Sequence, residues 1–352
     1  MIKQNYKVLG VMSGTSLDGI DLAVCSFDFH KKIYYRIELA ETIPYSDHWK
    51  NRLQNGVSLS SEMLTQLNIE YTTYLGAVIK TFILKNKIKD LDAVCSHGHT
   101  ILHQPHNGIT LQIGNLKEIS EIIDETVVCN FRVQDLLLGG QGAPLVPLGD
   151  RLLFSHYSYC LNLGGFANVS KTQDDVSTAY DICPVNIVMN QYAEKLGMPY
   201  DSGGDFARSG VVLPSILAAL NALPYYKKEP PKSLGVEWVH TAITPILEAA
   251  MASPQDVLRT CIAHFSSQIA RQFTPGSTVL VTGGGAYNTY LLEQIKKQTK
   301  VALIVPSSLL VDFKEALLFA LLGVLKLRGE VNCLSSVTGA SQDHSSGIIF
   351  KN

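Results

Sequence analysis

The sequence lacks any C-x-x-C pair, although it contains seven cysteines among 352 residues. Most of these cysteines lie inside apolar runs such as LAVCSF and YCLNL, which is typical of reduced, buried thiols. We therefore expect neither a disulfide framework nor a zinc site. A reducing compartment, the cytoplasm, is the expected location.

Strong charge and long apolar runs are also absent. The formal net charge is −2, and only 17% of the residues are charged. No long basic run points to nucleic acid or to a membrane surface. No stretch of about 18 uncharged apolar residues predicts a membrane span, and MIKQNYKVLG has no signal-peptide core. A small-molecule substrate bound at a local site is the remaining expectation.

Several common catalytic motifs are missing as well. The chain has no G-x-x-x-x-G-K-[ST], which excludes a Walker P-loop, and no G-x-G-x-x-G dinucleotide turn. The G-x-S-x-G elbow and the H-E-x-x-H metal pair do not occur either. A phosphate site in this chain would have to use backbone amides and a cation instead of a Walker lysine.

The chain instead shows an α/β pattern, with 46% hydrophobic residues and apolar runs that alternate with helical periodicity. Its length predicts two domains. We place an N-terminal lobe at 1–135 and a second lobe at 136–325, with a tail of about 326–352 that can pack back on the first lobe. The predicted strands are KVLGVM, DLAVCSF, AVCSHG, TVVCNF, YCLNLGG, STVLVTGGG and VALIVP, and the predicted helices are 60–87, 186–197 and 312–329.

The densest turn signal is GVMSGTSLDGIDLAV, in which a tight turn joins two apolar strands. Glycines let backbone N–H groups approach an anion closely, and Ser13, Thr15 and Ser16 add hydroxyl donors. Asp18 could then hold a hydrated cation beside a bound phosphate. The alternative is a plain β-hairpin with good turn chemistry.

Two further glycine turns support a nucleotide site. VTGGGAYN lies between a predicted strand and a predicted helix, where three glycines would form a flat shelf for a nucleobase or ribose. A close-packed turn would explain one or two of these glycines equally well. LNLGGFANVS resembles the first turn, because each has a strand, a turn of small residues and then a hydroxyl or amide side chain. Two such hairpins facing each other across a cleft would form a two-lobed nucleotide site.

The segment SHGHTILHQPH holds four histidines. No carboxylate or thiolate completes a convincing zinc spacing, so we interpret it as a strand-end loop that lines a polar cleft. His97 and Thr100 are the expected hydrogen-bonding contacts to substrate. His103 and His106 are expected at the loop surface.

Four further charged residues leave the choice between a structural and a functional role open. Arg132 either pairs with Asp135 or clamps a substrate carboxylate. Asp181, at a break before a predicted helix, is either an N-cap or a general base. Asp312 and Glu315 lie in the first turn of the predicted helix 312–329, where acidic side chains interact favourably with the helix dipole.

The set and order of these motifs are similar to those of the anhydro-N-acetylmuramic acid kinase family. GTSLDG followed by GGQGAPLVP and VTGAS is highly specific as a combination. The matching segments run over nearly the whole chain and comprise GVMSGTSLDGID, SHGHT, TLQIGN, FR..D, GGQGAPLVP, NLGGFAN, the segment around Asp181, PPKSLG, GGGAYN, DFKEALLFA and VTGAS.

The resemblance implies an α/β, two-lobed, actin-like ATPase (ribonuclease H-like) fold with an interlobe active-site cleft. It also implies a cytoplasmic enzyme of cell-wall recycling that uses ATP and Mg²⁺ and forms a homodimer. The implied reaction opens the 1,6-anhydro ring of anhydro-N-acetylmuramic acid and phosphorylates O6.

The resemblance further implies roles for individual residues. Asp181 would be the general base, Glu315 would lie near the reacting sugar, and Asp18 would hold the metal. His97, Thr100 and Arg132 would bind the sugar. The implied nucleotide-binding residues are Gly14, Thr15, Ser16, Leu17, Asp18, Gly19, Ile20, Asp21, Gly164, Gly165, Gly283, Gly284, Gly285 and Asn288.

The chain departs from the family pattern at a few positions. It reads DICPVN where D-T-G-P-G-N is usual, so Cys183 and Val185 replace glycines. It reads HGHT for HGQT, NFR for DFR and KSLGVE for K-S-T-G-R-E, with changes at His99 and Val236. Two other functions are carried as alternatives: a simple hydroxyl kinase of a related amino sugar, and an actin-like ATP-binding module that moves its lobes for a partner.

Overall fold

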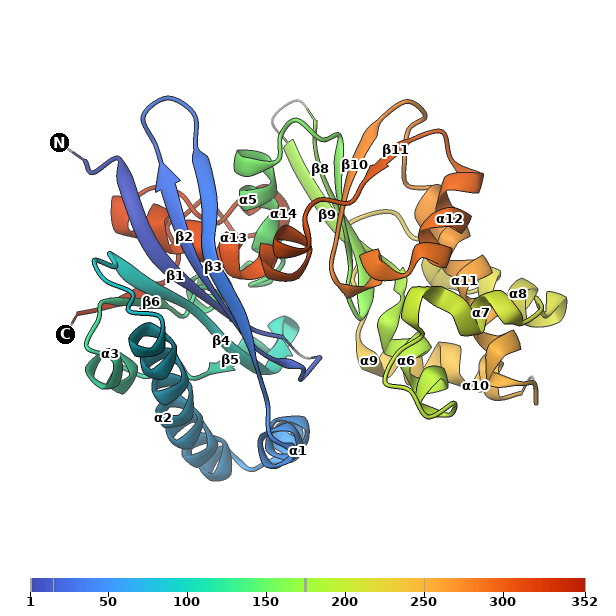
Figure 1. The fold of residues 1–352 in the computed structure, drawn as a ribbon, viewed down its shortest axis with the longest axis horizontal. Coiled ribbons are helices and arrows are strands. Elements are labelled where there is room, and N and C mark those ends of the chain that lie inside the picture. The colour runs from blue at the N-terminus through green and yellow to red at the C-terminus, as the bar shows by residue number, and fades with distance from the viewer. Residues whose placement is uncertain (1, 15, 174–175, 250, 352) are drawn as a thin grey trace. The chain divides into compact units, whose positions relative to one another are not determined.

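The structure, a computed structural model, describes residues 2–14, 16–173, 176–249 and 251–351. The chain divides into two compact units (Figure 1). Unit 1 comprises Met1–Leu153 and Phe313–Asn352, and unit 2 comprises Phe154–Asp312. In the described part of the chain, no helix is both long enough and apolar enough to cross a membrane.

Unit 1 is built on a mixed sheet with the order β12-β6-β4-β1-β2-β3, and β5 pairs with β4. β1, β2 and β3 are antiparallel neighbours, whereas β4 runs parallel to β1 and β6 runs parallel to β4. The elements are β1 (Asn5–Ser13), β2 (Gly19–Asp28), β3 (Tyr34–Pro44), α1 (Asp47–Asn55), α2 (Ser61–Lys85), β4 (Ala93–Gln104), β5 (Ile109–Ile113), α3 (Glu118–Ile123), β6 (Val127–Cys129), α4 (Val133–Leu137), α5 (Val146–Leu153), α13 (Ser308–Arg328), α14 (Ser335–Thr338) and β12 (Ile348–Phe350).

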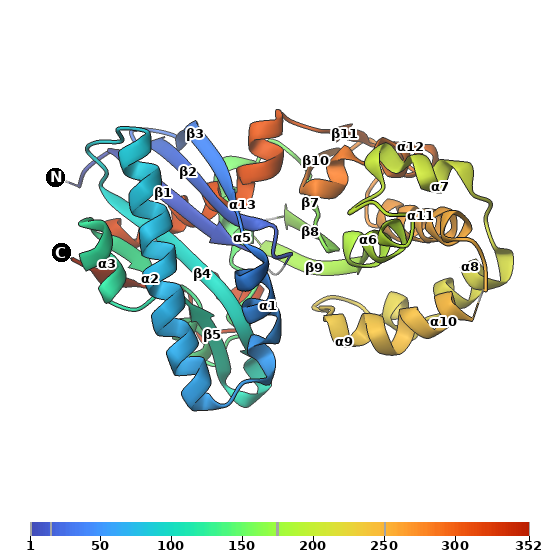
Figure 2. The ribbon, with the colours of Figure 1, turned by 60° about the horizontal axis from the view of Figure 1, so that its bottom comes forward.

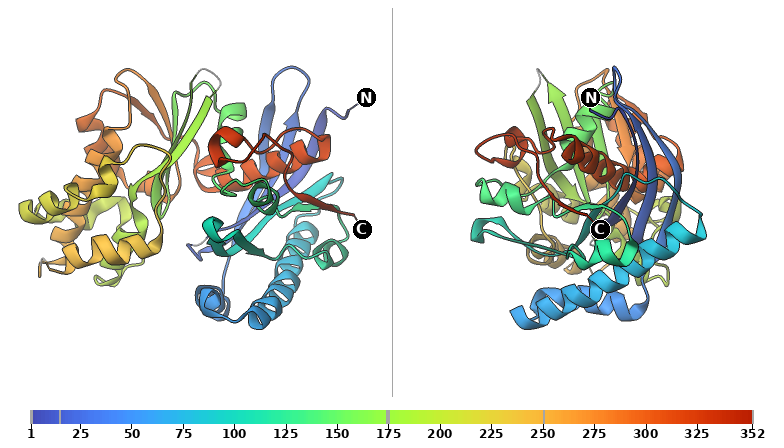
Figure 3. Two further views of the ribbon diagram at one scale, coloured as in Figure 1. Left: turned by 180° about the vertical axis from the view of Figure 1, so that it is seen from behind. Right: turned by 90° about the vertical axis from the view of Figure 1, so that its left-hand side faces the viewer.

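Helices cover both faces of this sheet. The α2 side chains Leu75 and Ile79 join one core with Leu9 and Val11 of β1. The ribbon shows α2 lying across this face of the sheet (Figure 2). Because side chains alternate along a strand, the intervening Gly10 faces the other side. There a Cβ on Gly10 would lie 2.0 Å from the carbonyl oxygen of the α13 residue Ala316, so α13 lies directly on the strand backbone (Figure 3).

Unit 2 has a sheet of order β11-β10-β7-β8-β9. β7, β8 and β9 are antiparallel neighbours, and β10 and β11 continue the sheet in parallel. The elements are β7 (Tyr159–Leu163), β8 (Phe166–Gln173), β9 (Val176–Pro184), α6 (Asn186–Glu194), α7 (Asp205–Ser209), α8 (Pro214–Asn221), α9 (Val236–Trp238), a π-helical turn (Val239–Ile243), α10 (Thr244–Glu248), α11 (Pro254–Ala270), β10 (Thr278–Thr282), α12 (Thr289–Gln298) and β11 (Ala302–Ile304), with short 3₁₀ turns between several of them.

The two units therefore share one topology. In each, three antiparallel strands are followed by two parallel strands on the side of the first strand. The order is β3-β2-β1-β4-β6 in unit 1, where β5 and β12 are additional antiparallel strands, and β9-β8-β7-β10-β11 in unit 2. This is the strand order of the ribonuclease H-like fold, present twice as in actin-like ATPases. The expected fold class is thus observed in both units.

The unit boundaries fall at 153/154 and 312/313, whereas the sequence suggested about 135 and 325. Contacts explain both positions. Gly149 of α5 packs against Leu318 of α13, and Asp135 binds the Thr338 hydroxyl near the C-terminus. These contacts tie residues 136–153 and all of the chain after 312 to unit 1.

All seven cysteines are free and buried, as expected from the apolar runs that hold them. Two local expectations differ from the structure. The SHGHT segment is not a loop, because residues 93–104 form β4, paired with β1, β5 and β6. Asp181 does not stand in a break, because it lies within β9.

Candidate active site

The first glycine turn is the tip of the β1–β2 hairpin, which pairs from Asn5↔Asp28 to Ser13↔Ile20. In the tip, the Leu17 N–H donates to Gly14 O over 3.3 Å, and Leu17 adopts a left-handed φ of 59°. A Cβ on Gly14 would meet nothing closer than 3.4 Å, so the backbone is open there. Thr15 lies outside the described residues. An open turn of this kind can receive an anion on its amides.

Asp18 and Ser16 are exposed beside this tip. Among the described residues, Asp18 has no hydrogen-bond or ion-pair partner. Mg²⁺ prefers oxygen ligands and is often held by one carboxylate together with water and phosphate oxygens. The exposed Asp18 carboxylate beside the open turn is a ligand of this kind. The residues present therefore fit the metal that the resemblance implies.

The last three residues of the predicted nucleotide segment contribute to the sheet. A Cβ on Gly19 would lie 2.5 Å from Ile43 O on β3, so this glycine permits strand packing. Ile20 is fully buried in the core. Asp21 accepts a hydrogen bond from Thr42 across the same strand pair. Nucleotide contacts by these three residues stay a prediction.

The second predicted hairpin, between β7 and β8, is docked on the start of α6. Val185 N–H donates to Gly165 O over 2.8 Å, and Asn186 N–H donates to Gly164 O over 3.3 Å. The hairpin carbonyls thereby satisfy N–H groups that a helix start leaves free. The outer side of the hairpin is open, since a Cβ on Gly164 or Gly165 would meet nothing closer than 3.5 Å.

The third glycine turn packs against this hairpin. A Cβ on Gly283 would lie 2.5 Å from Asn162 Oδ1, and a Cβ on Gly285 would lie 2.7 Å from Leu163 Cβ. Gly284 is different, because it is exposed and a Cβ there would meet nothing closer than 3.7 Å. Unit 2 thus brings the two predicted glycine turns together, with Gly284 as the open position of the shelf.

Asn288, which was predicted to bind nucleotide, is buried and caps α12. Its Oδ1 accepts from Leu291 N–H over 2.9 Å. Its fit against Gly204 is tight, because a Cβ on that glycine would lie 2.4 Å from the same oxygen. The structure gives Asn288 a structural role, and a contact with nucleotide stays a prediction.

Asp181 is half-buried in β9, next to the irregular pairing where Ala167↔Cys183 gives way to Asn168↔Asp181. Its Oδ2 accepts from Leu234 N–H over 2.9 Å. Burial raises the pKa of Asp181 to about 6, against the opposing effect of that hydrogen bond. A carboxyl that ionises just below neutral pH has the property required of a general base.

Aromatic residues missed at the sequence level surround Asp181. The Tyr225 hydroxyl donates to the Asp181 backbone oxygen over 2.6 Å, and the Tyr225 ring lies 5.2 Å from that of Trp238. The Lys232 ammonium lies over Tyr225, and its backbone oxygen accepts from Asp181 N–H. The signal was the mixture of Tyr, Lys and Trp in LPYYKKEPPKSLGVEW, around the family-matching segment PPKSLG.

The two residues that replace family glycines near Asp181 point inward. Cys183 and Val185 are fully buried members of the unit 2 core. Their side chains therefore occupy core space instead of projecting from the Asp181 strand into solvent.

In unit 1, β4 and the segment before α4 bring His97 and Arg132 together. Arg132 Nε donates to His97 Nε2 over 3.0 Å, and Arg132 Nη1 donates to Gly142 O over 2.7 Å. His97 Nδ1 lies 2.9 Å from Gly98 O, so that nitrogen carries the proton. Burial and the adjacent guanidinium hold the pKa of His97 well below its usual range, and the ring is neutral. His97 thus positions Arg132.

The two alternatives for Arg132 can now be compared. Arg132 and Asp135 do not pair directly but meet through Gly142, whose N–H donates to Asp135 Oδ2 and whose oxygen accepts from Arg132. Burial lowers the pKa of Arg132 to about 10, which leaves it charged. The guanidinium is fixed at one edge, and its Nη2 makes no hydrogen bond within the described residues.

Glu315 lies on α13 beside a buried ion pair. Lys314 Nζ lies 2.7 Å from Asp150 Oδ1, and both side chains are buried. Burial raises the pKa of Glu315, while the cations Lys314 and Arg132 oppose that effect. Lys314 and Asp150 were missed, although Lys314 precedes Glu315 in the DFKEA motif itself.

Thr100 and His99 complete the polar part of β4. Thr100 Oγ1 accepts from Gln112 on the neighbouring β5. His99 Nδ1 lies 2.7 Å from Ser13 Oγ at the end of β1, and the same oxygen lies 2.6 Å from the Tyr45 hydroxyl. Burial lowers the pKa of His99 to about 4. His99, which replaces the family glutamine, is therefore a neutral ring that contacts Ser13 where the first hairpin begins its turn.

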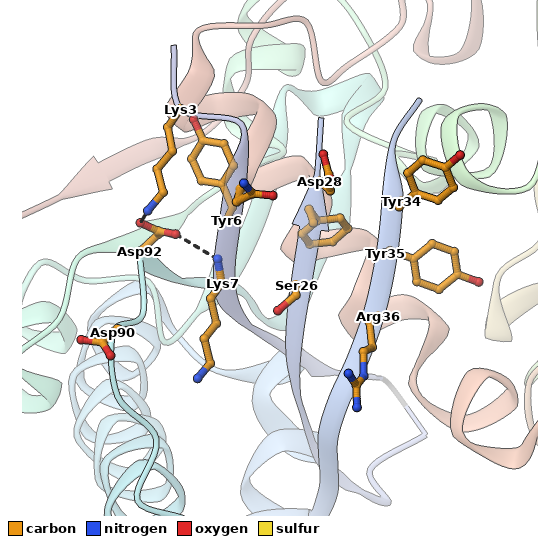
Figure 4. Close-up of a pocket in the computed structure, with 12 residues that line it drawn as sticks. Lys3, Tyr6, Lys7, Ser26, Asp28, Tyr34, Tyr35, Arg36, Asp90 and Asp92 are labelled. Carbon is orange, nitrogen blue, oxygen red and sulfur yellow. Dashed lines mark hydrogen bonds and ion pairs between the residues drawn. The ribbon is translucent and has the colours of Figure 1, made fainter. Parts of the chain in front are cut away.

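A depression of about 560 Å³ lies elsewhere on unit 1, over the ends of β1, β2 and β3 (Figure 4). At one side of it, Asp92 accepts hydrogen bonds from the Lys7 backbone N–H and the Lys3 ammonium, and Tyr34 and Tyr35 project from β3 at the other. None of the predicted site residues lines it. It is a separate surface feature.

Two ribonuclease H-like units that each carry a glycine hairpin after the first strand define the class of protein. It is a protein of the actin-like ATPase fold. A match to the family described as "Anhydro-N-acetylmuramic acid kinase" covers residues 6–352. The chain belongs to the anhydro-N-acetylmuramic acid kinase family.

Curated relatives with the same name agree over nearly the full length. The chain is 34% identical to the anhydro-N-acetylmuramic acid kinase of Francisella tularensis subsp. novicida (strain U112), over 94% of this chain and 95% of the relative. It is 30% identical to that of Sulfurimonas denitrificans over 97% and 99%. It is 31% identical to that of Bacillus cereus (strain G9842) over 95% and 96%.

Similar solved structures are more distant. Component A of (R)-2-hydroxyglutaryl-CoA dehydratase from Acidaminococcus fermentans is 12% identical, with a TM-score of 0.46 over 91% of this chain and 98% of that chain. The activator of 2-hydroxyisocaproyl-CoA dehydratase from Clostridium difficile is 12% identical, with a TM-score of 0.44 over 90% and 94%. Likeness at this level bears on neither substrate nor mechanism.

Proposed function

We propose that this protein is an ATP-dependent kinase that opens the 1,6-anhydro ring of anhydro-N-acetylmuramic acid and phosphorylates O6. The product would be N-acetylmuramic acid 6-phosphate, and the setting cell-wall recycling. Membership of the family supports the substrate and the reaction. The observation that carries the chemistry is Asp181, a half-buried carboxyl with a pKa near 6.

Asp181 is the proposed base. It takes a proton from a water molecule as that water attacks the anomeric carbon of the sugar. The bond from C1 to O6 breaks, and O6 attacks the γ-phosphorus of ATP, releasing ADP. No second carboxylic acid is required, because the freed O6 ends on phosphorus, unlike the leaving group of an ordinary glycosidase. The proton on Asp181 returns to solvent.

Unit 1 supplies the proposed sugar contacts. Arg132, fixed by His97 and Gly142, would bind a carboxylate of the substrate through its free edge. A lactyl carboxylate is what distinguishes muramic acid from glucosamine, so this contact would favour the muramic sugar. Thr100 would add a hydroxyl contact. Glu315 would accept a hydrogen bond from the sugar, with its charge balanced by Arg132 and Lys314.

The proposed nucleotide contacts are the open backbone positions. Gly14 and Ser16 in unit 1 and Gly164 and Gly165 in unit 2 would bind phosphate oxygens, and Gly284 would lie under the nucleoside. Asp18 would hold Mg²⁺ through its exposed carboxylate. Bound there, the ion would neutralise charge on the phosphoryl group in transfer.

The cellular setting is part of the same proposal. A family of cell-wall recycling and the absence of disulfides support a cytoplasmic enzyme. The family resemblance likewise supports a homodimer. Sedimentation of the purified protein checks the assembly state, and a monomer at assay concentrations would contradict it.

The product distinguishes the proposed reaction from its alternatives. The protein is incubated with ATP, Mg²⁺ and the anhydro sugar, and ADP release and product mass are measured. The proposal requires the sugar to gain one water and one phosphoryl group. A phosphoryl group alone would identify a simple hydroxyl kinase. ADP release that no sugar stimulates would identify an ATP-binding module.

Asp181→Asn tests the base in the same assay. Because Asn is nearly isosteric but cannot take the proton, we expect turnover to fall by roughly 10²–10⁴-fold. Far-ultraviolet circular dichroism and ATP binding should be unchanged. Turnover within a few fold of the wild type would overturn the assignment.

A further inference from the structure

A cluster outside the proposed site joins three distant parts of unit 1. Asp135 on α4, Cys333 and His344 each offer one donor atom, and these atoms lie within 4.8 Å of one another. All three residues are buried, with 0%, 1% and 6% of their surfaces exposed, respectively. No described role in the proposed reaction uses them.

The backbone holds two members of the cluster side by side. Cys333 and His344 face each other in an antiparallel bridge, and each N–H donates to the carbonyl oxygen of the other over 3.1 Å. Side chains of such directly opposed residues lie on one face with their Cβ atoms about 5 Å apart. Both therefore project toward Asp135, which the α4 segment presents from the other side.

His344 has one ring nitrogen in use and one free. Its Nδ1 lies 3.1 Å from Gln342 O, so Nδ1 carries a proton and donates it to that carbonyl. Its Nε2 is buried without a hydrogen-bond partner and lies 3.6 Å from Asp135 Oδ1. A metal-binding histidine is typically oriented in this way, with the distal nitrogen donating to a backbone carbonyl.

Two electron-rich atoms, an imidazole nitrogen and a carboxylate oxygen, thus face each other in a buried space. The Asp135 oxygen accepts hydrogen bonds from Cys333 and Thr338, whereas His344 Nε2 has no hydrogen-bond partner, and buried polar atoms are normally hydrogen-bonded or bound to a metal. A third donor atom close to this pair favours the metal. Cys333 Sγ lies 3.1 Å from the same Asp135 oxygen, and sulfur, nitrogen and oxygen at these separations suit ligand bonds of about 2.0–2.3 Å.

We propose that Asp135, Cys333 and His344 bind a divalent transition-metal ion of the zinc type. Thiolate, imidazole and carboxylate are the donors that Zn²⁺ accepts, and one thiolate with one carboxylate neutralises its charge. Binding releases the Cys333 proton to solvent, and the sulfur then bonds to the metal instead of donating to Asp135. Thr338 Oγ1, which lies 2.7 Å from Asp135 Oδ1, offers an oxygen for a fourth position.

The ion would link the C-terminal segment to α4. The other Asp135 oxygen accepts from Gly142 N–H, and Gly142 O accepts from Arg132. The metal would therefore stabilise unit 1 and the loop that holds Arg132. The site cannot be found from local sequence spacing, because its ligands come from three segments with none of the usual close spacing.

The test uses the full-length protein, purified without chelators or a polyhistidine tag. It is incubated with ZnCl₂, passed through a desalting column and analysed by inductively coupled plasma mass spectrometry. We expect about one Zn²⁺ per chain. After replacement by Co²⁺, a sulfur-to-cobalt charge-transfer band should appear in the near ultraviolet, and chelator treatment should lower the melting temperature.

Variants assign the ligands. Cys333→Ala and His344→Ala should lose the zinc and the cobalt band, whereas Cys25→Ala, which removes another buried thiol of unit 1, should keep both. Wild-type protein that retains well below one ion per chain, with no cobalt band, would overturn the proposal. Because the wild-type measurement decides alone, a variant that fails to fold does not obscure the result.

Discussion

At the scale of single residues, the pKa of Asp181 makes a pH dependence the sharpest expectation. The base must be ionised to accept a proton from water, and burial raises its pKa to about 6. We expect kcat/KM to be constant above about pH 7 and to fall about tenfold per pH unit well below 6. Initial rates of ADP release with the anhydro sugar, at constant ionic strength, measure this limb.

Glu315 is the control for this assignment, because burial raises its pKa as well. In Glu315→Gln the acid limb near pH 6 should persist even if the overall rate falls. Loss of the limb in that variant would transfer the titration from Asp181 to Glu315.

Stability provides an independent check on Asp181. Its folded pKa of about 6 lies above the ordinary value of 3.8, so the folded chain binds this proton more tightly than the unfolded chain. The resulting contribution to stability is complete below about pH 4 and is lost as the pH rises through about 6. The free energy of unfolding of Asp181→Asn, minus that of the wild type, should therefore be larger above pH 6 than at pH 4. Denaturant unfolding of both proteins at the two pH values measures this difference.

At the scale of elements, two adjacent glycines of the third glycine turn have different expected roles. Gly285 is needed for folding, and Gly284 for ligand binding. Gly285→Ala would force a Cβ to 2.7 Å from Leu163 Cβ and 2.9 Å from Leu163 O, and such overpacking costs about 1–3 kcal/mol. Gly284→Ala meets nothing closer than 3.7 Å. We expect Gly285→Ala to lower the melting temperature, and Gly284→Ala to leave it unchanged but raise the KM for ATP.

Thermal melts and ATP titrations of both variants check this pair. A wild-type KM for ATP in Gly284→Ala would remove this turn from the nucleotide site. A wild-type melting temperature in Gly285→Ala would show that the turn can shift away from β7.

The elements that could be predicted were those with a strong local signal. The hairpin of β1 and β2, the long helix α2 and the end of α13 at Gly329, which adopts a φ of 71°, follow from alternation, helical periodicity and the left-handed terminal glycine. β3 was missed because charged residues interrupt its apolar ones in YYRIELAETIP, and none of its side chains is buried. β9 was missed because Asp181, three residues before Pro184, looks like the end of a strand or a helix cap.

The candidate site was predictable as residue types but not as contacts. The motifs identify His97 and Arg132, yet only the fold shows that both His97 nitrogens are in use and that the ring positions the guanidinium. Likewise, nothing in DICPVN indicates that Cys183 and Val185 face the core. Such assignments depend on register and on partners from distant segments, which local patterns do not encode.

At the scale of the whole molecule, the two units differ in how the chain builds them. Unit 2 is one continuous segment, Phe154–Asp312, and its core cluster draws on that segment alone. Unit 1 needs the chain after residue 312, because α13 covers one face of its sheet. Gly10 and Gly323 mark that contact: a Cβ on Gly323 would lie 2.2 Å from Cys95 Sγ of β4.

This difference predicts how fragments behave. A fragment of residues 154–312 should fold alone, with a cooperative thermal transition by circular dichroism, because its sheet and core are complete. A fragment of residues 1–153 should not, since its sheet would expose the apolar face that α13 covers. A rearranged chain, with residues 313–352 joined by a flexible linker ahead of residue 1 and ending at 153, should recover cooperative folding. Equal folding of 1–153 with and without the added segment would mean that α13 is an accessory to unit 1 and not part of its core.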